Sequence, residues 1–233
     1  MKGPDVQFSR YAIYYTPPKG PLADFGASWL GWDLVSGIPV AHTEIPGLSH
    51  DIKTLTDTPR KYGLHGTLKP PFRLAKGKDI EGLEHACTAM AATLAPITLE
   101  GLELTRLGGF LALTVKGNQT ALSNLAGEVV RTLDPFRASP SAEELARRRK
   151  ANLNERQEAY LVQWGYPYVM DEFRFHITLT GRVPRGQAET LRETLAPHIA
   201  PYLPTPLPVN DLTLVGEDDT GMFHEIRRFP LLG

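Results

Sequence analysis

The stretch Phe-Arg-Phe-His-Ile-Thr-Leu-Thr at residues 173–180 predicts a β-strand with one apolar and one polar face. A strand sends alternate side chains to opposite faces, so its four apolar residues share one face and can pack on a core. The other face carries Arg174, His176 and Thr178. We expect these polar side chains to face water or a ligand, because burying them without partners is unfavourable.

The same pattern occurs in Gly-Leu-His-Gly-Thr-Leu-Lys at residues 63–69, where His65, Thr67 and Lys69 share the predicted polar face. Each stretch is followed by a predicted helix and a predicted hairpin, and the hairpin turns, at Gly108 and Asp219, lie equally far beyond the two histidines. This repetition predicts an internal duplication. We expect two lobes related by an approximate two-fold axis, with their polar rows facing each other across one cleft.

Other segments carry local signals of their own. Gly108-Gly109 predicts a hairpin turn, and Ser141 begins a Ser-Ala-Glu-Glu capping box that predicts one helix from there to about Trp164. Residues 33–61 are expected to form irregular surface loops. The remaining predicted elements are strands at 10–16, 97–106, 110–115, 209–215 and 222–229, and helices at 21–32, 79–93, 119–133 and 187–199. The pattern predicts a single bilobal α+β domain over residues 1–233, with halves at roughly 10–117 and 118–230 and a helical insertion at about 134–169.

The charge balance and the cysteine content restrict the class of partner and the compartment. Lys and Arg total 25 against 26 Asp and Glu, which favours a small ligand over long nucleic acid, because proteins that hold long nucleic acid usually have a basic excess. Cys87 is the only cysteine, so no intramolecular disulfide forms. Residues 1–5 do not begin a signal peptide, and no apolar run is long enough to span a membrane. We therefore expect a cytoplasmic protein with no membrane partner.

Two histidines beside two threonines suit acid–base chemistry on a phosphoester. An ordinary histidine titrates near 6.5, so one of His65 and His176 can take a proton while the other gives one. The hydroxyls of Thr67 and Thr178 can donate hydrogen bonds to phosphate oxygens, and Lys69 and Arg174 are the nearest expected cations. The chemistry that fits is the opening of a cyclic phosphodiester without a metal. The sequence contains no His-Glu-x-x-His motif, no Cys/His ligand grouping and no phosphate-cradling glycine loop.

Further candidates for the cleft are aromatic or basic. Tyr14 is expected on the less apolar face of the first strand, where it either contacts the ligand or is an ordinary half-buried tyrosine. Arg60, Arg73 and Arg10 either bind a second phosphate or are solvated surface arginines. The basic run at residues 147–150 is either a solvated helix face or a patch that attracts an anionic substrate.

At these residues the sequence resembles the 2H phosphoesterase superfamily, which is named for its two His-x-Thr/Ser motifs. Within it, residues 60–72, 164–169 and 173–181 resemble the DUF1045-like branch found with phosphonate-utilisation genes. The resemblance implies a bilobal α+β fold with two antiparallel sheets related by a pseudo-two-fold axis, helices flanking them and a central cleft. It also implies no metal cofactor, His65 and His176 as the acid–base pair, and Thr67 and Thr178 as phosphate donors, with either histidine able to be the acid.

The function that this resemblance implies is a hydrolase, a metal-independent cyclic phosphodiesterase. The genomic association suggests a small phosphorylated substrate, a phosphorylated ribose 1,2-cyclic phosphate of phosphonate breakdown. One alternative is a phosphodiesterase or ligase of 2′,3′-cyclic nucleotides or RNA ends. Another is a phosphate or nucleotide sensor without turnover. The sequence does not indicate an oligomeric state.

Overall fold

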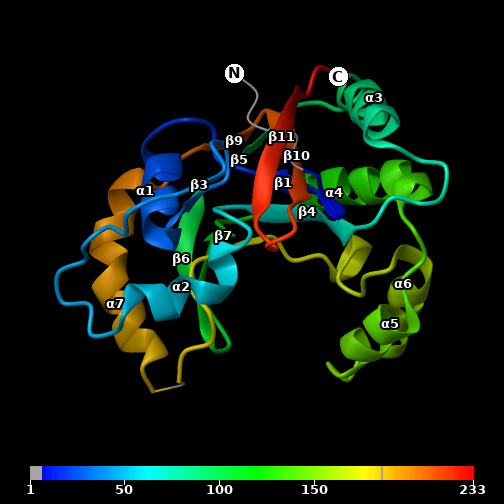
Figure 1. The fold of residues 1–233 in the computed structure, drawn as a ribbon. Coiled ribbons are helices and arrows are strands. Elements are labelled where there is room, and N and C mark those ends of the chain that lie inside the picture. Colours follow the sequence, from blue (N-terminus) through cyan, green and yellow to red (C-terminus); the bar gives the residue numbers. More distant parts are fainter. Residues whose placement is uncertain (1–6, 185) are drawn as a thin grey trace.

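The computed structural model describes residues 7–184 and 186–233, in which seven antiparallel strands form one sheet (Figure 1). The order of the strands across the sheet is β11-β10-β1-β4-β8-β7-β6. Their bounds are β1 Arg10–Tyr15, β4 Gly66–Phe72, β6 Leu102–Leu107, β7 Phe110–Val115, β8 His176–Thr178, β10 Asp211–Glu217 and β11 Phe223–Pro230. Two further pairs are β2 Trp32–Asp33 with β3 Ile38–Pro39, and β5 Ile97–Leu99 with β9 Leu207–Val209.

Seven α-helices accompany the sheet in the described part of the chain, which confirms the predicted α+β class. They are α1 Pro21–Leu30, α2 Ile52–Arg60, α3 Ile80–Ala91, α4 Thr120–Leu133, α5 Ala142–Arg149, α6 Glu155–Trp164 and α7 Ala188–Ile199. Three 3₁₀ turns complete the elements: η1 Asp134–Phe136, η2 Met170–Glu172 and η3 Ala200–Tyr202. Figure 1 shows α5 and α6 together on one side of the sheet, away from α1, α2 and α7.

The two predicted sheets are joined into one, because β4 and β8 pair directly, with Gly66 opposite Ile177. The hairpin β6–β7 comes from the first half of the chain but pairs with β8 of the second half. The hairpin β10–β11 comes from the second half but joins the sheet through β1 of the first half. The strands that carry the two His-x-Thr motifs are therefore central neighbours, with β4 between β1 and β8, and β8 between β4 and β7.

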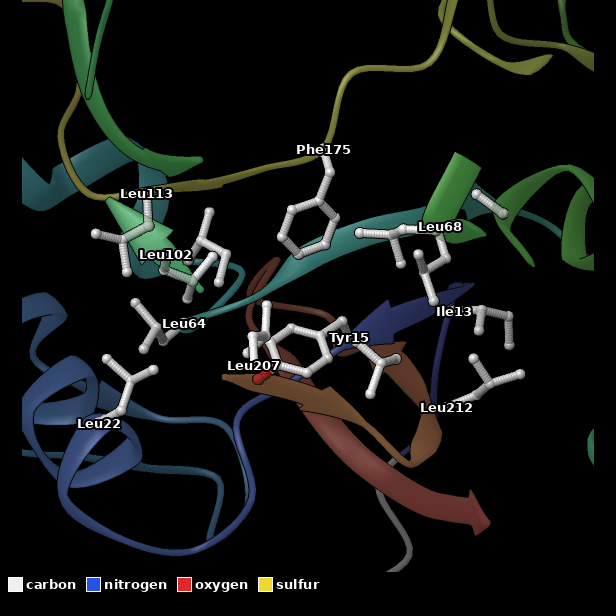
Figure 2. Packing of buried hydrophobic residues seen from close by; sticks show 14 of the residues in the cluster. Ile13, Tyr15, Leu22, Leu64, Leu68, Leu102, Leu113, Phe175, Leu207 and Leu212 are labelled. Carbon is white, nitrogen blue, oxygen red and sulfur yellow. The ribbon is translucent and has the colours of Figure 1, made fainter. Parts of the chain in front are cut away.

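One face of the sheet packs on a large hydrophobic core. Helix α4 packs on β4, α3 on β10 and β11, and α7 on β6 and β7. Figure 2 shows Phe175, Tyr15, Leu64 and Leu68 converging in this core. A Cβ on Gly66 would come within 2.2 Å of the Phe175 ring, so glycine leaves room for the ring at the junction of the two central strands.

Four segments differ from the sequence prediction. The region 33–61 is not all loop, because Asp51 caps the N-terminus of α2 and accepts hydrogen bonds from the backbone N–H groups of Lys53 and Thr54. The expected helix from Ser141 to Trp164 is two helices, since Asn154 forms a second capping box with Gln157 and starts α6. The expected strand at 97–106 is divided between β5 and β6 at Gly101, whose φ is 149°. The polar stretch 173–180 contributes only three residues to β8.

Two local predictions, a capping box and a hairpin turn, are confirmed. The capping box at Ser141 is present, and Gly108-Gly109 closes the hairpin between β6 and β7. In the described residues, no helix is long and apolar enough to cross a membrane. The prediction about residues 1–5 lies outside the described residues.

Candidate functional site

The pairing of β4 with β8 brings four polar side chains onto one face of the sheet. Gly66 lies opposite Ile177 in an antiparallel pair. Extending this register by one residue in each direction places Thr67 opposite His176 and His65 opposite Thr178. Directly opposite residues have Cβ atoms about 4.5–5.5 Å apart. Each histidine therefore lies opposite the threonine of the other strand, and all four side chains are on the face opposite the core.

Each imidazole ring is held by a hydrogen bond to the backbone carbonyl group two residues before it. Nδ1 of His65 lies 3.0 Å from the carbonyl oxygen of Gly63, and Nδ1 of His176 lies 2.9 Å from the carbonyl oxygen of Arg174. A carbonyl oxygen only accepts hydrogen bonds, so each neutral ring carries its proton on Nδ1 and donates it. This leaves Nε2 of each ring as an acceptor. Nε2 of His65 lies 3.2 Å from the hydroxyl oxygen of Thr67, which is positioned to donate to it.

The surroundings of the two histidines differ. The ring of Tyr14 lies 4.0 Å from that of His65, centre to centre, and the ring of Tyr62 lies 5.7 Å from it. This enclosure lowers the pKa of His65 to about 4, mainly through burial and additionally through the nearby His176, so His65 is neutral at pH 7. The ring of Phe110 lies 5.9 Å from that of His176, centre to centre.

A pocket of about 330 Å³ opens beside these side chains, and we call it the histidine pocket. Thr67 and His176 line it, together with Arg174, whose guanidinium donates to the carbonyl oxygens of Asp171 and Phe173. The rest of its lining is largely apolar and aromatic: Leu68, Pro70, Leu107, Tyr166, Tyr168, Val169, Glu172 and Phe173. A polar corner in an apolar pocket is the usual composition of a small-molecule site.

Lys69 does not lie on the face of the histidines, contrary to the prediction. Thr67 pairs with Tyr14, but Lys69 pairs with Ile13, so β4 contains one residue more than β1 over this interval. Such a bulge shifts the alternation of side chains and turns Lys69 toward the core. Lys69 is only 1% exposed, and its ammonium donates to the carbonyl oxygen of Val130 and lies 3.6 Å from Asp134. Burial lowers its pKa to about 8.

Two other candidates are also held within the protein. Arg60 donates from Nε to the carbonyl oxygen of Leu30 and from Nη2 to that of Lys53, so it ties α2 to α1 and does not line the histidine pocket. Tyr14 lies on the expected face, opposite Thr67, but it is 0% exposed. Its hydroxyl has no hydrogen-bond partner in the described residues. It contacts His65 directly instead of the open pocket.

The sequence reasoning missed three aromatic residues at the site. Tyr62 and Phe110 lie beside the histidines, and Tyr166 lines the pocket. Tyr62 precedes its strand and Phe110 begins a strand of another hairpin, so no alternation pattern connects them with the motifs. Among the described residues, no three His, Cys, Asp or Glu side chains are grouped so that they could hold a metal ion.

Comparison with known proteins identifies a family and named relatives. The profile of the family described as "Protein of unknown function (DUF1045)" matches residues 67–224. The chain is 39% identical over 232 residues to a "Ribose 1,5-bisphosphate phosphokinase PhnN" of Janthinobacterium sp. (strain Marseille), a match that covers 97% of this chain and 51% of that protein. It is 31% identical over 215 residues to a protein of the same name from Laribacter hongkongensis (strain HLHK9), with 91% and 49% covered. The chain thus spans about half the length of the curated relatives it matches.

Two solved structures are similar at low sequence identity. The crystal structure of TT0787 of Thermus thermophilus has a TM-score of 0.45 and 15% identity, with 96% of this chain and 98% of that chain covered. A crystal structure described as a phosphoesterase has a TM-score of 0.45 and 14% identity, with 97% and 100% covered.

The names of the curated relatives contradict the prediction of a cyclic phosphodiesterase. A phosphokinase transfers a phosphoryl group from a donor to an acceptor, whereas the expected enzyme was a phosphoric diester hydrolase. The family expectation, in contrast, is confirmed, because the profile covers most of the chain and includes both threonines and His176 of the paired motifs. The chain belongs to the DUF1045 family.

Proposed function

We propose that the histidine pocket binds the phosphate group of a phosphorylated ribose, and that the chain thereby serves the phosphorylation of that sugar phosphate. One observation carries the proposal: two His-x-Thr pairs lie on one sheet face beside a pocket of about 330 Å³. The sugar phosphate itself is suggested by the relatives named ribose 1,5-bisphosphate phosphokinase. The proposed ligand is the sugar phosphate and not the nucleotide, because the sequence contains no Gly-x-x-x-x-Gly-Lys-Ser/Thr loop.

In this proposal the two threonines bind the phosphate oxygens. A threonine hydroxyl can donate to an anionic oxygen, and a hydrogen bond to a charged group contributes about 1.5–3 kcal/mol. Thr67 already points at Nε2 of His65 and turns to the phosphate when the ligand binds. Arg174, at the edge of the pocket, adds the positive charge that Lys69 does not supply.

His176 accepts the proton of the acceptor group, while His65 accepts a hydrogen bond at Nε2. A phosphate or hydroxyl group that receives a phosphoryl group has to lose its proton, and a positioned neutral imidazole takes it. His176 lines the pocket, and its Nε2 is the atom that takes the proton. His65 is held neutral by its enclosure between Tyr14 and Tyr62. Tyr14 acts as a positioning residue for His65. The exchange of strands between the two halves of the chain supports treating it as one domain.

Calorimetric titration tests the proposal. We expect ribose 5-phosphate and ribose 1,5-bisphosphate to bind the wild-type protein, and unphosphorylated ribose to bind far more weakly. The substitutions Thr67→Val and His176→Ala are expected to weaken sugar-phosphate binding by at least tenfold, which is about 1.4 kcal/mol. His85→Ala, which removes an exposed histidine on α3, is the matched control and is expected to bind normally. Equal affinity in all four proteins would refute the proposed site.

A further inference from the structure

A second pocket lies where the start of β1, the end of β4 and the helix α5 meet, and its lining is strongly basic. We call it the arginine pocket. It has a volume of about 60 Å³. Its charged lining residues are five arginines and one glutamate: Arg10, Arg73, Arg137, Arg147, Arg148 and Glu144. A chain with a net charge of -1 has no general basic excess, so this concentration is local.

Three of the five arginines are neutralised by carboxylates. Arg10 pairs with Glu217 through two hydrogen bonds, Arg73 lies 2.6 Å from Glu144, and Arg137 lies 2.8 Å from Asp134. Among the described residues, the other two arginines, at 147 and 148, make no ion pair. The pocket therefore keeps two positive charges for an incoming anion.

The pocket is built around a fixed guanidinium. The side chain of Arg137 is only 13% exposed, and its Nη2 donates to the carbonyl oxygen of Gln163 at 3.0 Å. Gly165 ends α6 in the left-handed conformation, with φ 72°, and a Cβ there would come 2.8 Å from Nη1 of Arg137. Glycine at this position therefore leaves room for the guanidinium against the backbone. An anion site that is already ordered loses less entropy when the ligand binds.

One aromatic side chain connects the two pockets. The guanidinium of Arg148 lies 4.6 Å from the centre of the Tyr166 ring, and Tyr166 lines the histidine pocket. The spacing along β1 gives a second measure, the distance from the arginine pocket to His65, because Arg10 lines that pocket and Tyr14 contacts His65. Arg10 and Tyr14 lie on the same face of β1, four residues apart, which is about 13 Å at 3.3 Å per residue. Long arginine side chains span part of that distance, so an elongated ligand with an anionic group at each end would fit both pockets.

We propose that the arginine pocket binds the second phosphate group of a doubly phosphorylated sugar whose first phosphate lies at the two histidines. This inference rests on the proposed function. A volume of about 60 Å³ accommodates several waters, and hence one phosphate group. Arginine is the side chain best suited to hold phosphate through two parallel hydrogen bonds. The adjoining hollow shares Arg10, Arg73, Glu144 and Arg147 with the arginine pocket and adds Asp218 and Asp219, whose carboxylates repel a phosphate, so the ligand is directed to the arginine pocket.

Calorimetric titration of three proteins with three ligands tests the inference. The proteins are the wild type, the double variant Arg147→Ala/Arg148→Ala, and the control Arg149→Ala/Lys150→Ala. The control removes two charges from the same helix end, but Arg149 pairs with Glu158 instead of lining the pocket. The ligands are ribose 1,5-bisphosphate, ribose 5-phosphate and ATP. Unfolding midpoints in urea establish that all three proteins are folded.

We expect the wild type to bind the bisphosphate at least tenfold more tightly than the monophosphate. The Arg147→Ala/Arg148→Ala variant is expected to lose that ratio and to keep its affinity for the monophosphate, while the control keeps both. An unchanged ratio in the arginine variant would overturn the inference and leave the proposed function intact. If ATP, and not the bisphosphate, depends on the two arginines, the pocket holds a nucleotide polyphosphate and the assignment to a sugar is wrong.

Failure of the proposed function gives a different result. In that case neither sugar phosphate binds the wild type, and inorganic pyrophosphate then serves as the probe. Pyrophosphate binding that is lost in Arg147→Ala/Arg148→Ala but kept in the control would support the arginine pocket as an anion site. Equal pyrophosphate binding in the three proteins, or none in any, would refute it.

Discussion

Replacing Gly66 with alanine is expected to disturb the junction on which the candidate site depends. Gly66 lies between His65 and Thr67 and pairs with Ile177 where β4 meets β8. Its missing side chain would point into the core, where a Cβ would come within 2.2 Å of one atom of the Phe175 ring and 2.3 Å of another. The Phe175 ring is 3% exposed and packs edge-on against Tyr15, at 5.9 Å between ring centres, so it has little room to move (Figure 2).

The expected cost follows from overpacking. Inserting a methyl group into a well-packed core destabilises a protein by about 1–3 kcal/mol. Gly66 has an ordinary backbone conformation, so alanine introduces no strain of its own there, and the cost is attributed to the contact with Phe175. Urea unfolding of wild type and Gly66→Ala gives the difference in free energy of unfolding. Sugar-phosphate affinity is expected to fall with it, because relief of the contact separates the two His-x-Thr strands.

A double-mutant cycle isolates the contact. Phe175→Leu removes the ring atoms that meet the new Cβ, so Gly66→Ala is expected to cost at least 1 kcal/mol less in the Phe175→Leu background. An additive double variant, or a Gly66→Ala protein as stable as the wild type, would refute the account of how β4 and β8 are held together.

Three other predictions concern single side chains. The wild-type free energy of unfolding is expected to fall by up to about 3 kcal/mol as the pH is lowered from 6.5 to 4, because unfolded His65 is protonated in that window while folded His65, with a pKa of about 4, is not. Urea titrations across this range are expected to show a weaker slope in His65→Asn, and parallel slopes would contradict the burial of His65. Lys69→Met is expected to change the free energy of unfolding by less than about 1 kcal/mol, since Arg137 still neutralises Asp134, and a loss above 3 kcal/mol would show that the Lys69 ion pair is essential. Asn154→Ala is expected to cost about 1 kcal/mol by removing the cap of α6, and an unchanged urea midpoint would count against that cap.

Local chemistry made part of the fold predictable from the sequence. Ser141 with Glu144 forms the capping box that the spacing indicates, and Gly108 takes a positive φ in the turn of the β6–β7 hairpin. The strands and helices that depend on such short-range signals lie close to their predicted bounds. The same kind of signal was present at Asp51 and Asn154, and recognising them as caps would have revealed α2 and the division between α5 and α6.

Long-range packing decided what the sequence alone did not indicate. Strict alternation places Lys69 on the same face as Thr67, but a register shift between β1 and β4 turns Lys69 into the core. There its ammonium donates to the carbonyl oxygen of Val130 and lies near Asp134. Pro70-Pro71, which follow Lys69 in this central strand, can signal a bulge. The register shift itself arises from the pairing with a strand more than fifty residues away in the sequence. The joining of two expected sheets into one has the same origin, because it depends on the β4–β8 pair at Gly66.

The two histidines show how surroundings distinguish residues that share a motif. In the sequence, each is followed two residues later by threonine, and in the structure each donates from Nδ1 to the carbonyl oxygen two residues before it. The equivalence ends there. The rings of Tyr14 and Tyr62 enclose His65 and disfavour its charged form, whereas His176 lines the open pocket beside Arg174. A group that stays neutral down to about pH 4 is a poor proton donor near neutrality. His65 is therefore suited to accept a hydrogen bond at Nε2, and in the proposed function His176 is the residue that exchanges a proton with the ligand.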